Sequence, residues 1–366
     1  MVRDVEVMII GAGPAGLCAA KALSGAGAKV ILVERDYVPG GQLVKQTHKF
    51  FGSERQFAGD RGFLIGRKLI AEIKHDPNVE VLTEATVLGM YEDGVVTVFH
   101  ENQHKKFRPT KTIIATGAAE KFLNFPNNDL PGIYGAGAVQ TLMNVAGVKP
   151  AERVVMVGAG NIGLIVSYQL MQAGVEVVSV VEAAPKIGGF LVHASKLRRA
   201  GVPIRTGYTV KEAYGKECLE GVILCQLDEK WQQIPGTEID VPCDTLCLAV
   251  GLTPLSEICF QAGCRMEYIR ELSGHVPITD ENLMTSVEGI YAAGDVSGIE
   301  EASSAMVEGR LVGYAVAVSL GYDVENSQKE VEAARAELQE LRSGPMGGKI
   351  RAGMQKMAEK RGDGLC

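Results

Sequence analysis

The sequence predicts an α/β protein built from two domains of the same class. Two observations carry this prediction: a strand, glycine-rich turn, helix and second strand near the N-terminus, and a second copy in which Gly158 follows Gly11 by about 147 positions. A length of 366 residues also suits two domains. The spacing is too long for a solenoid repeat, so each copy is expected to begin a domain of its own.

Composition narrows the classes of function. Lys and Arg total 37 and Asp and Glu total 44, for a net charge of −7, so the chain lacks the excess of positive charge typical of nucleic-acid binding. No uncharged apolar run reaches the roughly 18 residues that a membrane helix needs. The N-terminus superficially resembles a signal peptide, but Asp4 and Glu6 interrupt it. We therefore expect no nucleic-acid partner, no membrane span and a cytoplasmic location.

The eight cysteines show no CxxC spacing. In a long chain without a signal peptide, reduced and mostly buried thiols are the simplest interpretation, with no metal bound. The alternative is a metal or iron–sulfur site built from Cys243, Cys247, Cys259 and Cys264. It would need all four residues in loops, whereas Cys247 lies in a run typical of a strand.

The first repeat begins with an apolar run at 5–10, typical of a buried parallel strand. The turn GAGPAG at 11–16 follows, then a stretch of helical composition at 17–23. A second strand at 29–34 ends on Glu34. This order is the context that a GxGxxG dinucleotide-binding fingerprint requires.

Each part of this turn has a physical role in binding a dinucleotide. Gly11 makes the tight turn, Gly13 lets a pyrophosphate approach the backbone, and Gly16 lets helix and strand pack closely. The N–H groups at the helix start bind phosphates, and Glu34 would accept hydrogen bonds from ribose hydroxyls. The alternative is a glycine-rich turn that binds nothing. The candidate cofactor contacts here are Gly11, Gly13, Pro14, Ala15, Gly16, Glu34 and Arg35.

The second repeat has a strand at 153–157, a turn at 158–163, a helix at 164–172 and a strand at 175–181 followed by Glu182. An acid at this point favours a free 2′-hydroxyl and repels a 2′-phosphate, so NAD(H) is preferred over NADP(H). The site could instead be vestigial, or hold an adenine nucleotide without redox function. Its candidate contacts are Gly158, Gly160, Asn161, Ile162, Gly163 and Glu182.

Three further strands end in small residues. Those at 111–117 and 245–251 each follow a stretch rich in strand-forming residues and are interpreted as crossings between the domains. A third, at 289–296, contains Gly294-Asp295 and precedes an apolar helix at 301–319. Because a flavin accepts hydride and releases single electrons while a nicotinamide passes only hydride, two dinucleotide sites predict a relay with FAD in the first site.

The chain resembles the two-dinucleotide-binding flavoproteins, the broad family of thioredoxin reductases and pyridine nucleotide–disulfide oxidoreductases. The matching segments follow the family order and span about 5–325: VMIIGAGPAGL at 7–17, PGGQL at 39–43, IIATGA at 113–118, VVMVGAGNIG at 154–163, CLAVGLTP at 247–254 and GIYAAGDV at 289–296. The resemblance implies two Rossmann-like dinucleotide-binding domains, with the NAD(P) domain inserted into a split FAD domain. The expected bounds are 1–118 with 247–326 for the FAD domain, 119–246 for the NAD(P) domain and 327–366 for a C-terminal helix and tail.

The resemblance also implies further contacts with the cofactors. Asp295 would bind the ribityl–phosphate region, and Gln42 and the helix start near Glu301 and Ala302 would lie by the flavin ring. The complete set of contacts added on this basis is Gly41, Gln42, Val87, Ala115, Thr116, Gly117, Gly251, Gly294, Asp295, Glu301 and Ala302.

One departure from the family bears on function. The stretch at 132–139, where thioredoxin reductases carry a redox CxxC, contains no cysteine, and Cys18 stands alone in the first helix without a CxxxxC pair. We therefore expect that the chain does not reduce a disulfide through its own cysteine pair. The segments GIYGAGAVQTLMN at 132–144 and AGDVSGIEEASSAMVEGRLVG at 293–313 are more similar to flavoprotein subunits of amine and imino acid dehydrogenases. These include sarcosine oxidase alpha and subunits of opine oxidase and hydrogen cyanide synthase.

No catalytic residue is assigned, since hydride transfer to a flavin needs no obligatory side-chain acid or base. Lys45 and His48 follow the PGGQ segment and are weak candidates for steadying a reduced flavin, the alternative being an exposed rim. In the tail, apolar residues at helical spacing predict an amphipathic helix at 327–342. Methionines between basic residues at 346–361 suggest either a partner-docking segment or a solvated end.

Three functional hypotheses follow. In the first, an FAD-dependent oxidoreductase exchanges hydride with NAD(H) and passes electrons to or from a partner protein or second flavoprotein subunit, within a homo- or hetero-oligomer. In the second, the chain belongs to an amine or imino acid dehydrogenase-type complex and its second nucleotide site is structural. In the third, it is a non-catalytic nucleotide-binding scaffold subunit.

Overall fold

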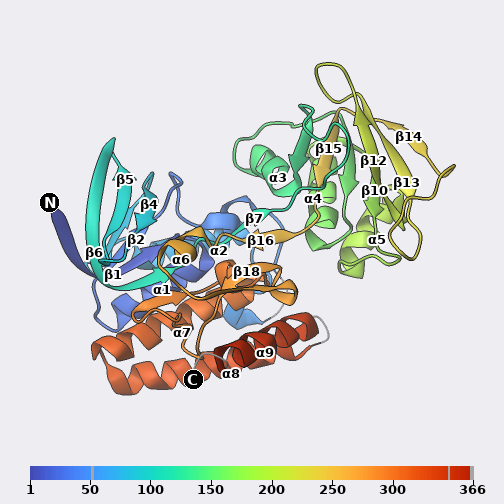
Figure 1. Ribbon diagram of the computed structural model, residues 1–366. Coiled ribbons are helices and arrows are strands. Elements are labelled where there is room, and N and C mark those ends of the chain that lie inside the picture. Colours follow the sequence, from blue (N-terminus) through green and yellow to red (C-terminus); the bar gives the residue numbers. More distant parts are fainter. Residues whose placement is uncertain (51–52, 345–346, 363–366) are drawn as a thin grey trace. The chain divides into compact units, whose positions relative to one another are not determined.

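Two compact units make up the chain in a computed structural model, which describes residues 1–50, 53–344 and 347–362. Unit 1 comprises Met1–Ala119 and Thr253–Cys366, and unit 2 comprises Glu120–Leu252 (Figure 1). The α/β architecture with one parallel-sheet unit inserted between two segments of the other is confirmed. The chain passes between the units twice, and strands β7 (Ala118–Glu120) and β16 (Leu252–Pro254) at these points pair with each other.

The return to unit 1 comes later in the chain than the predicted boundary at 246/247. Strand β15 (Thr245–Leu248) lies between β9 (Arg153–Val157) and β8 (Ile133–Gly135), in parallel with both. Its hydrogen bonds therefore hold it inside unit 2. The boundary is corrected to Leu252/Thr253.

A seven-stranded sheet forms the centre of unit 1. Its order is β3-β2-β1-β6-β5-β4, with β19 also paired to β6. Strands β1, β2, β3, the second half of β6 and β19 are parallel, whereas β4, β5 and the first half of β6 form an antiparallel extension. The strands are β1 (Val2–Ile10), β2 (Val30–Val33), β3 (Val79–Leu82), β4 (Thr86–Met90), β5 (Val96–His100), β6 (Gln103–Ile114) and β19 (Ile290–Ala292).

Both faces of the parallel part are buried, which explains its nearly continuous apolar sequence. Along β1, Val7 and Ile9 belong to one hydrophobic cluster, while Met8 and Ile10 belong to a second cluster. The first cluster also contains residues of four helices: α1 (Pro14–Gly25), α2 (Gly62–Ile73), α7 (Ala302–Leu320) and α8 (Val324–Ser343). The remaining regular elements of this unit include the short helix α6 (Glu257–Gln261) and the hairpin of β17 (Met266–Ile269) and β18 (Gly274–Pro277).

Small residues allow α1 and α7 to pack very closely. A Cβ atom added to Gly309 would lie 2.1 Å from the carbonyl oxygen of Ala15, and one added to Gly313 would lie 2.8 Å from that of Ala19. Larger residues at these two positions could not be accommodated without moving one helix. The composition of α7 therefore fixes the start of α1, which follows the first glycine-rich turn.

Unit 2 repeats the parallel design. Its five-stranded parallel sheet has the order β11-β10-β9-β15-β8, and Val154 and Met156 of β9 face one hydrophobic cluster while Val155 and Val157 face another. A separate antiparallel sheet has the order β12-β13-β14. The elements not yet given are β10 (Glu176–Glu182), β11 (Ile204–Thr206), β12 (Tyr208–Tyr214), β13 (Gly221–Gln226), β14 (Ile239–Pro242), α3 (Ala136–Asn144), α4 (Asn161–Gln172) and α5 (Leu191–Arg199).

The C-terminal segment forms two helices that pack on unit 1, α8 (Val324–Ser343) and α9 (Gly348–Gly362) (Figure 1). The predicted amphipathic helix is confirmed, and α8 buries Val331, Ala334 and Leu338. Met354 and Met357 pack with Leu272 of the same chain, so these two methionines contribute to the core of unit 1, and docking of the tail to a partner stays a prediction. Met346 lies outside the described residues.

Candidate dinucleotide-binding sites

The first glycine-rich turn joins β1 to α1 at the carboxyl edge of the parallel strands. Gly11 has φ of +103°, and a Cβ atom there would lie 2.3 Å from the carbonyl oxygen of Ala115, so only glycine fits. Gly16 packs equally tightly on the Gly11 carbonyl. At Gly13, by contrast, an added Cβ would meet only the Cα of Gly41, at 3.9 Å. The turn is thus rigid at its ends and open at its centre.

The start of α1 is suited to an anion. Gly13 is the N-cap, no side chain caps the helix, and Pro14 occupies the first turn. Backbone N–H groups at such a start, together with the helix dipole, attract phosphate. The open β position of Gly13 lies at the same place, which is what a pyrophosphate approaching the backbone requires.

Glu34 is buried directly beside this turn. Its Oε2 accepts a hydrogen bond from the Ala12 amide at 2.8 Å, and its Oε1 accepts one from the Asp36 amide at 3.0 Å. Only 6% of the residue is exposed. Each carboxylate oxygen can accept a second bond, so Glu34 is held in place and keeps acceptor capacity for a ribose hydroxyl.

The PGGQ segment folds back over the turn. The Gly40 amide donates to the Ala12 carbonyl at 2.8 Å, and a Cβ atom on Gly41 would lie 2.8 Å from the Cα of Gly13. Gly117 has open space at its β position, and Thr116 Oγ1 donates to the Leu255 carbonyl at 2.6 Å. The Ala115 amide bonds Ile10 at 2.8 Å, so this crossing strand borders the same turn.

Gly294 and Asp295 lie at the same edge. A Cβ atom on Gly294 would be 3.0 Å from the Cβ of Ala15, which places this turn against the first turn of α1. Asp295 Oδ1 accepts from the Glu300 amide at 3.4 Å, and burial raises the pKa of Asp295 to about 6. Glu301 is the N-cap of α7, and Ala302 is its first residue. The structure therefore brings the 294–302 segment to the start of α1.

A buried acid that the sequence analysis missed supports this turn. Glu308 of α7 is 3% exposed, and its Oε2 accepts a hydrogen bond from the Gly294 amide at 2.7 Å. The sequence does contain a signal for this acid, because Glu308 is a charged residue within a helix of small and apolar residues. Such a residue is expected to have a buried polar partner.

Other predicted residues of unit 1 lie farther from this arrangement or at its margin. Gln42 is exposed, while Lys45 and His48 are partly buried, with the ring of His48 stacked on Phe50 at 5.7 Å between centroids. Val87 of β4 packs at the edge of the cluster that contains Ile10. Arg35, the residue after Glu34, is exposed. None of these positions reveals an acid–base role.

The second turn has the same glycine geometry as the first. Gly158 also has φ of +103°, and a Cβ atom there would lie 2.3 Å from the Ala249 carbonyl. Gly163 packs on the carbonyl of Gly158, and Gly160 has nothing within 4 Å of its β position. Gly160 is the N-cap of α4, again without a capping side chain. The open centre and the free helix start are therefore present in both units.

Glu182 is fixed in the same manner as Glu34. Its Oε2 accepts from the Ala159 amide at 2.8 Å and its Oε1 from the Ala184 amide at 2.9 Å. The Gly189 amide donates to the Ala159 carbonyl at 2.9 Å, as Gly40 does to Ala12. Asn161 Oδ1 accepts from the Phe190 amide at 2.9 Å. The repeat thus extends beyond the glycines to the acid and to a second Gly-Gly segment.

Two remaining candidates border this second turn. Ile162, the second residue of α4, is partly exposed. Gly251 has φ of +111°, and its carbonyl accepts from the Lys121 amide at 2.9 Å. Both positions belong to unit 2, although the predicted bounds placed Gly251 in the FAD domain.

The residues of both turns fit a dinucleotide. The β positions of Gly13 and Gly160 are spaces that any side chain would fill, each beside an uncapped helix start and a fixed carboxylate. Among the described residues, no group of three His, Cys, Asp or Glu side chains could hold a metal ion. The seven described cysteines are free, five of them buried, and burial raises the pKa of Cys18 to about 12.

Comparison with models of known protein families finds a match over most of this chain. The family described as pyridine nucleotide-disulphide oxidoreductase matches residues 5–309. The chain belongs to this family. It is therefore a member of a flavoprotein oxidoreductase family that binds FAD, and the resemblance seen in the sequence motifs is confirmed.

Two named proteins are similar to this chain over half of its length or more. An opine oxidase subunit from Agrobacterium tumefaciens (strain Ach5) is 30% identical over 333 residues, which cover 86% of this chain and 66% of that protein. The alpha subunit of sarcosine oxidase from Rhizobium meliloti (strain 1021) is 33% identical over 198 residues, 50% of this chain and 19% of that protein. The chain thus spans just under two thirds of the first relative and a small part of the second.

Solved structures share the fold of this chain. Thioredoxin reductase of T. acidophilum superposes with a TM-score of 0.72 at 21% identity, covering 87% of this chain and 99% of that chain. At this identity the likeness establishes the fold. Within the described residues, no helix is long and apolar enough to cross a membrane.

Proposed function

We propose that this family member is an FAD-dependent oxidoreductase that exchanges hydride with NAD(H) and passes electrons to or from a partner protein or subunit. The observation that carries the proposal is the duplication of the complete turn, including the fixed carboxylates of Glu34 and Glu182. If the second site were only a non-functional remnant of a duplicated domain, Glu182 would not need to keep its two hydrogen bonds to backbone amides. Two intact dinucleotide sites support a relay between two redox cofactors.

In unit 1, the chain's own residues would bind and orient FAD. The N–H groups at the start of α1 would bind the pyrophosphate, Glu34 would accept from the adenosine ribose, and Asp295 would accept from the ribityl chain. Gly117 and Gly41, which carry no side chain, would allow the cofactor to approach the backbone. Bound FAD supplies the ability to accept hydride and to release electrons singly.

In unit 2, Glu182 would select the nucleotide. Two backbone amides fix its carboxylate, which would accept a hydrogen bond from a ribose 2′-hydroxyl and repel a 2′-phosphate. The next residues, at 183–186, are Ala-Ala-Pro-Lys, so Lys186 is the one cation of this short segment. Because a single cation does not replace the arginines that accommodate a 2′-phosphate, the charge favours NAD(H).

Electrons would leave or enter through another protein. The stretch at 132–139 carries no cysteine, and Cys18 is a partly buried thiol with a raised pKa, so neither supplies a redox disulfide. The relatives are named subunits, which supports a homo- or hetero-oligomer in which a partner subunit completes the reaction.

A second candidate follows from the relatives' names. The names opine oxidase and sarcosine oxidase support a role for this chain as the flavoprotein subunit of an amine or imino acid dehydrogenase-type complex. In that case the second nucleotide site has a structural role, and the partner subunit supplies the amine site. A third candidate, a nucleotide-binding scaffold without catalysis, makes no use of the flavin.

An anaerobic titration separates these candidates. FAD-reconstituted protein is titrated with NADH and, separately, with NADPH while flavin absorbance is recorded. Bleaching by NADH at lower concentration than NADPH supports the proposal. Binding of FAD without bleaching by either nucleotide contradicts the hydride exchange and favours the amine-type complex. If the protein shows no flavin absorbance after reconstitution, the third candidate, a scaffold without catalysis, is favoured.

A further inference from the structure

We infer that Arg342 of α8 is a positioning residue for the flavin-binding turn at Gly294 and Asp295, and acts through Glu308 and Glu300. The inference rests on the proposed function for the place of the flavin. Arg342 lies beyond residues 5–309, the part of the chain that the family model matches. The C-terminal helices would therefore control the geometry of a site that the family segment builds.

Glu308 connects the turn to α7. Its Oε2 accepts the Gly294 amide at 2.7 Å, and its Oε1 faces Arg342. Gly294 is held at φ of +80°. A carboxylate that accepts this amide fixes the direction of the peptide just before Asp295, so a change at Glu308 would turn that peptide.

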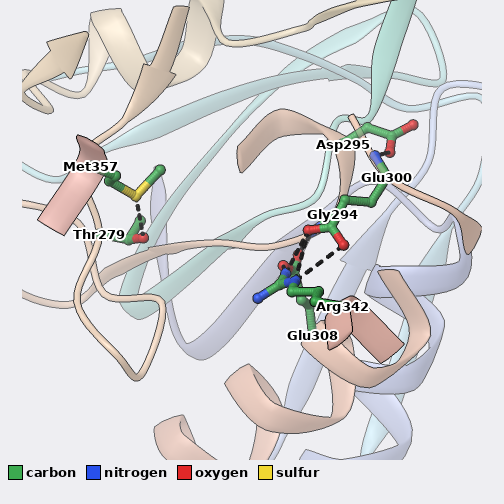
Figure 2. Close-up of polar contacts among 7 residues, drawn as sticks. All are labelled: Thr279, Gly294, Asp295, Glu300, Glu308, Arg342 and Met357. Atoms are coloured by element: carbon green, nitrogen blue, oxygen red, sulfur yellow. Dashed lines mark hydrogen bonds and ion pairs between the residues drawn. The ribbon is translucent and has the colours of Figure 1, made fainter. Parts of the chain in front are cut away.

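Arg342 joins two acids that hold opposite ends of the turn (Figure 2). One guanidinium nitrogen donates to Glu308 Oε1 at 2.5 Å and to Glu300 Oε1 at 2.6 Å, and Nε donates to both oxygens of Glu300 at 3.1 Å. The planar guanidinium of Arg342 carries several N–H donors and can contact both acids at once. A lysine ammonium could not reproduce all of these hydrogen bonds.

Glu300 completes the loop back to Asp295. Its backbone amide donates to Asp295 Oδ1 at 3.4 Å. Arg342 thus reaches the peptide before Asp295 through Glu308 and the Asp295 carboxylate through Glu300. A displacement of Arg342 would therefore shift both the peptide before Asp295 and the Asp295 carboxylate, which would hold the ribityl chain.

The charges of this cluster are buried. Side-chain exposure is 15% for Arg342, 9% for Glu300 and 4% for Glu308. Burial raises the pKa of Glu308 to about 7, and Arg342 opposes that rise. Removing Arg342 would leave two buried carboxylates without their cation, which is a costly arrangement.

Helix α9 supports the same segment from another side. A Cβ atom on Gly353 would lie 2.7 Å from the side chain of Leu272, and one on Gly298 would lie 3.0 Å from it, so Leu272 separates α9 from the residues after Asp295. Thr279 Oγ1 donates to the Met357 sulfur at 3.4 Å (Figure 2). This packing holds the C-terminal helices in place and keeps Arg342 within hydrogen-bond distance of Glu300 and Glu308.

The test compares Arg342→Met with Arg310→Met. Arg310 of α7 pairs with Glu337 of α8, a similarly buried acid, but makes no contact with Gly294 in the interactions described. Arg342→Met removes two ion pairs of α8, to Glu308 of α7 and to Glu300 just before it, and Arg310→Met removes one pair between α7 and α8. The measurements are the FAD dissociation constant, hydrogen–deuterium exchange of a peptide spanning 290–300 in the apoprotein, and the melting temperature.

We expect Arg342→Met to raise the FAD dissociation constant at least about tenfold and to speed exchange of 290–300. Arg310→Met should lower the melting temperature comparably but leave FAD binding within about twofold. Arg342→Lys should recover part of the affinity, and it is also the variant to use if Arg342→Met does not fold. Equal FAD affinity and exchange in the two methionine variants would overturn the inference, whereas failure of the unaltered protein to bind FAD would overturn the proposed function.

Discussion

Glu182 Oε2 lies 2.8 Å from the backbone nitrogen of Ala159, and this hydrogen bond ties the acid after the second strand to the centre of the glycine-rich turn of unit 2. The pair Glu34 and Ala12 has the same separation in unit 1. In each unit the acid is therefore oriented before any nucleotide arrives. Preorganisation of this kind reduces the entropy lost on binding.

Replacing Glu182 should change the nucleotide preference. Glu182→Gln removes the negative charge that opposes a 2′-phosphate and weakens the acceptor for a ribose hydroxyl. We expect NADH affinity to fall about 10- to 100-fold, as for loss of a hydrogen bond to a charged group, while NADPH affinity is kept or improved. Binding of both nucleotides is measured calorimetrically.

A matched control lies on the same strand. Glu176 begins β10 and is paired with Arg153 at the surface, so Glu176→Gln should leave both affinities unchanged. If Glu182→Gln loses NADH and NADPH affinity equally, Glu182 does not select between the two nucleotides.

A side chain in the open β position of Gly13 or of Gly160 should abolish binding at one nucleotide site and leave binding at the other intact. The β positions of Gly13 and Gly160 have no close neighbours, so Gly160→Val should fold and lose affinity for the pyridine nucleotide while FAD binding persists. Gly13→Val should lose FAD, because its side chain would occupy the place of the pyrophosphate. Gly25→Ala, at the open end of α1, is the control. Retention of NADH affinity by Gly160→Val would show that no pyrophosphate binds there.

Asp295 should make the stability of the apoprotein depend on pH. Burial raises its pKa from 3.8 to about 6, so the ionised carboxylate destabilises the fold fully above pH 6 and not at all below 3.8. At pH 8 this penalty is about 2–3 kcal/mol. Asp295→Asn should therefore stabilise the apoprotein at pH 8, and the gain should shrink to about 1 kcal/mol at pH 4.5.

Urea unfolding of the apoprotein at the two pH values provides the measurement. Asp4→Asn, at an exposed surface residue, is the control for the loss of one carboxylate. A gain from Asp295→Asn that is the same at both pH values would contradict the assigned protonation of Asp295.

The buried thiols Cys259 and Cys264 offer a check on the absence of an internal redox disulfide. The Cys259 thiol donates to Cys264, which lowers the pKa of Cys264 to about 7, and both residues lie within a hydrophobic cluster. We expect Cys259→Ala/Cys264→Ala to cost stability but to leave reduction of the flavin by NADH within about twofold of the unaltered protein. Cys218→Ser, at an exposed thiol, is the control. Loss of electron flow to the partner in the double variant alone would show that electrons do pass through this pair.

Much of the architecture was open to prediction because it depends on local patterns. The apolar run at 5–10, the spacing of Gly11, Gly13 and Gly16, and the acid at the end of the next strand are all neighbours in sequence, and each was interpreted correctly as an element of the fold. Contacts such as those of Lys45 and His48 were not predictable in the same way, since residue type alone does not say what a side chain faces.

The sequence by itself determined the fold class, the family and the two glycine-rich turns, because the geometry of those turns excludes other residues at Gly11 and Gly158. Only the tertiary structure decided where the tail packs and where unit 2 ends. The partners of Arg342 lie 34 and 42 positions away, and β15 remains in unit 2 through hydrogen bonds to β9. Such contacts arise from packing of distant elements, and no periodicity along the chain records them.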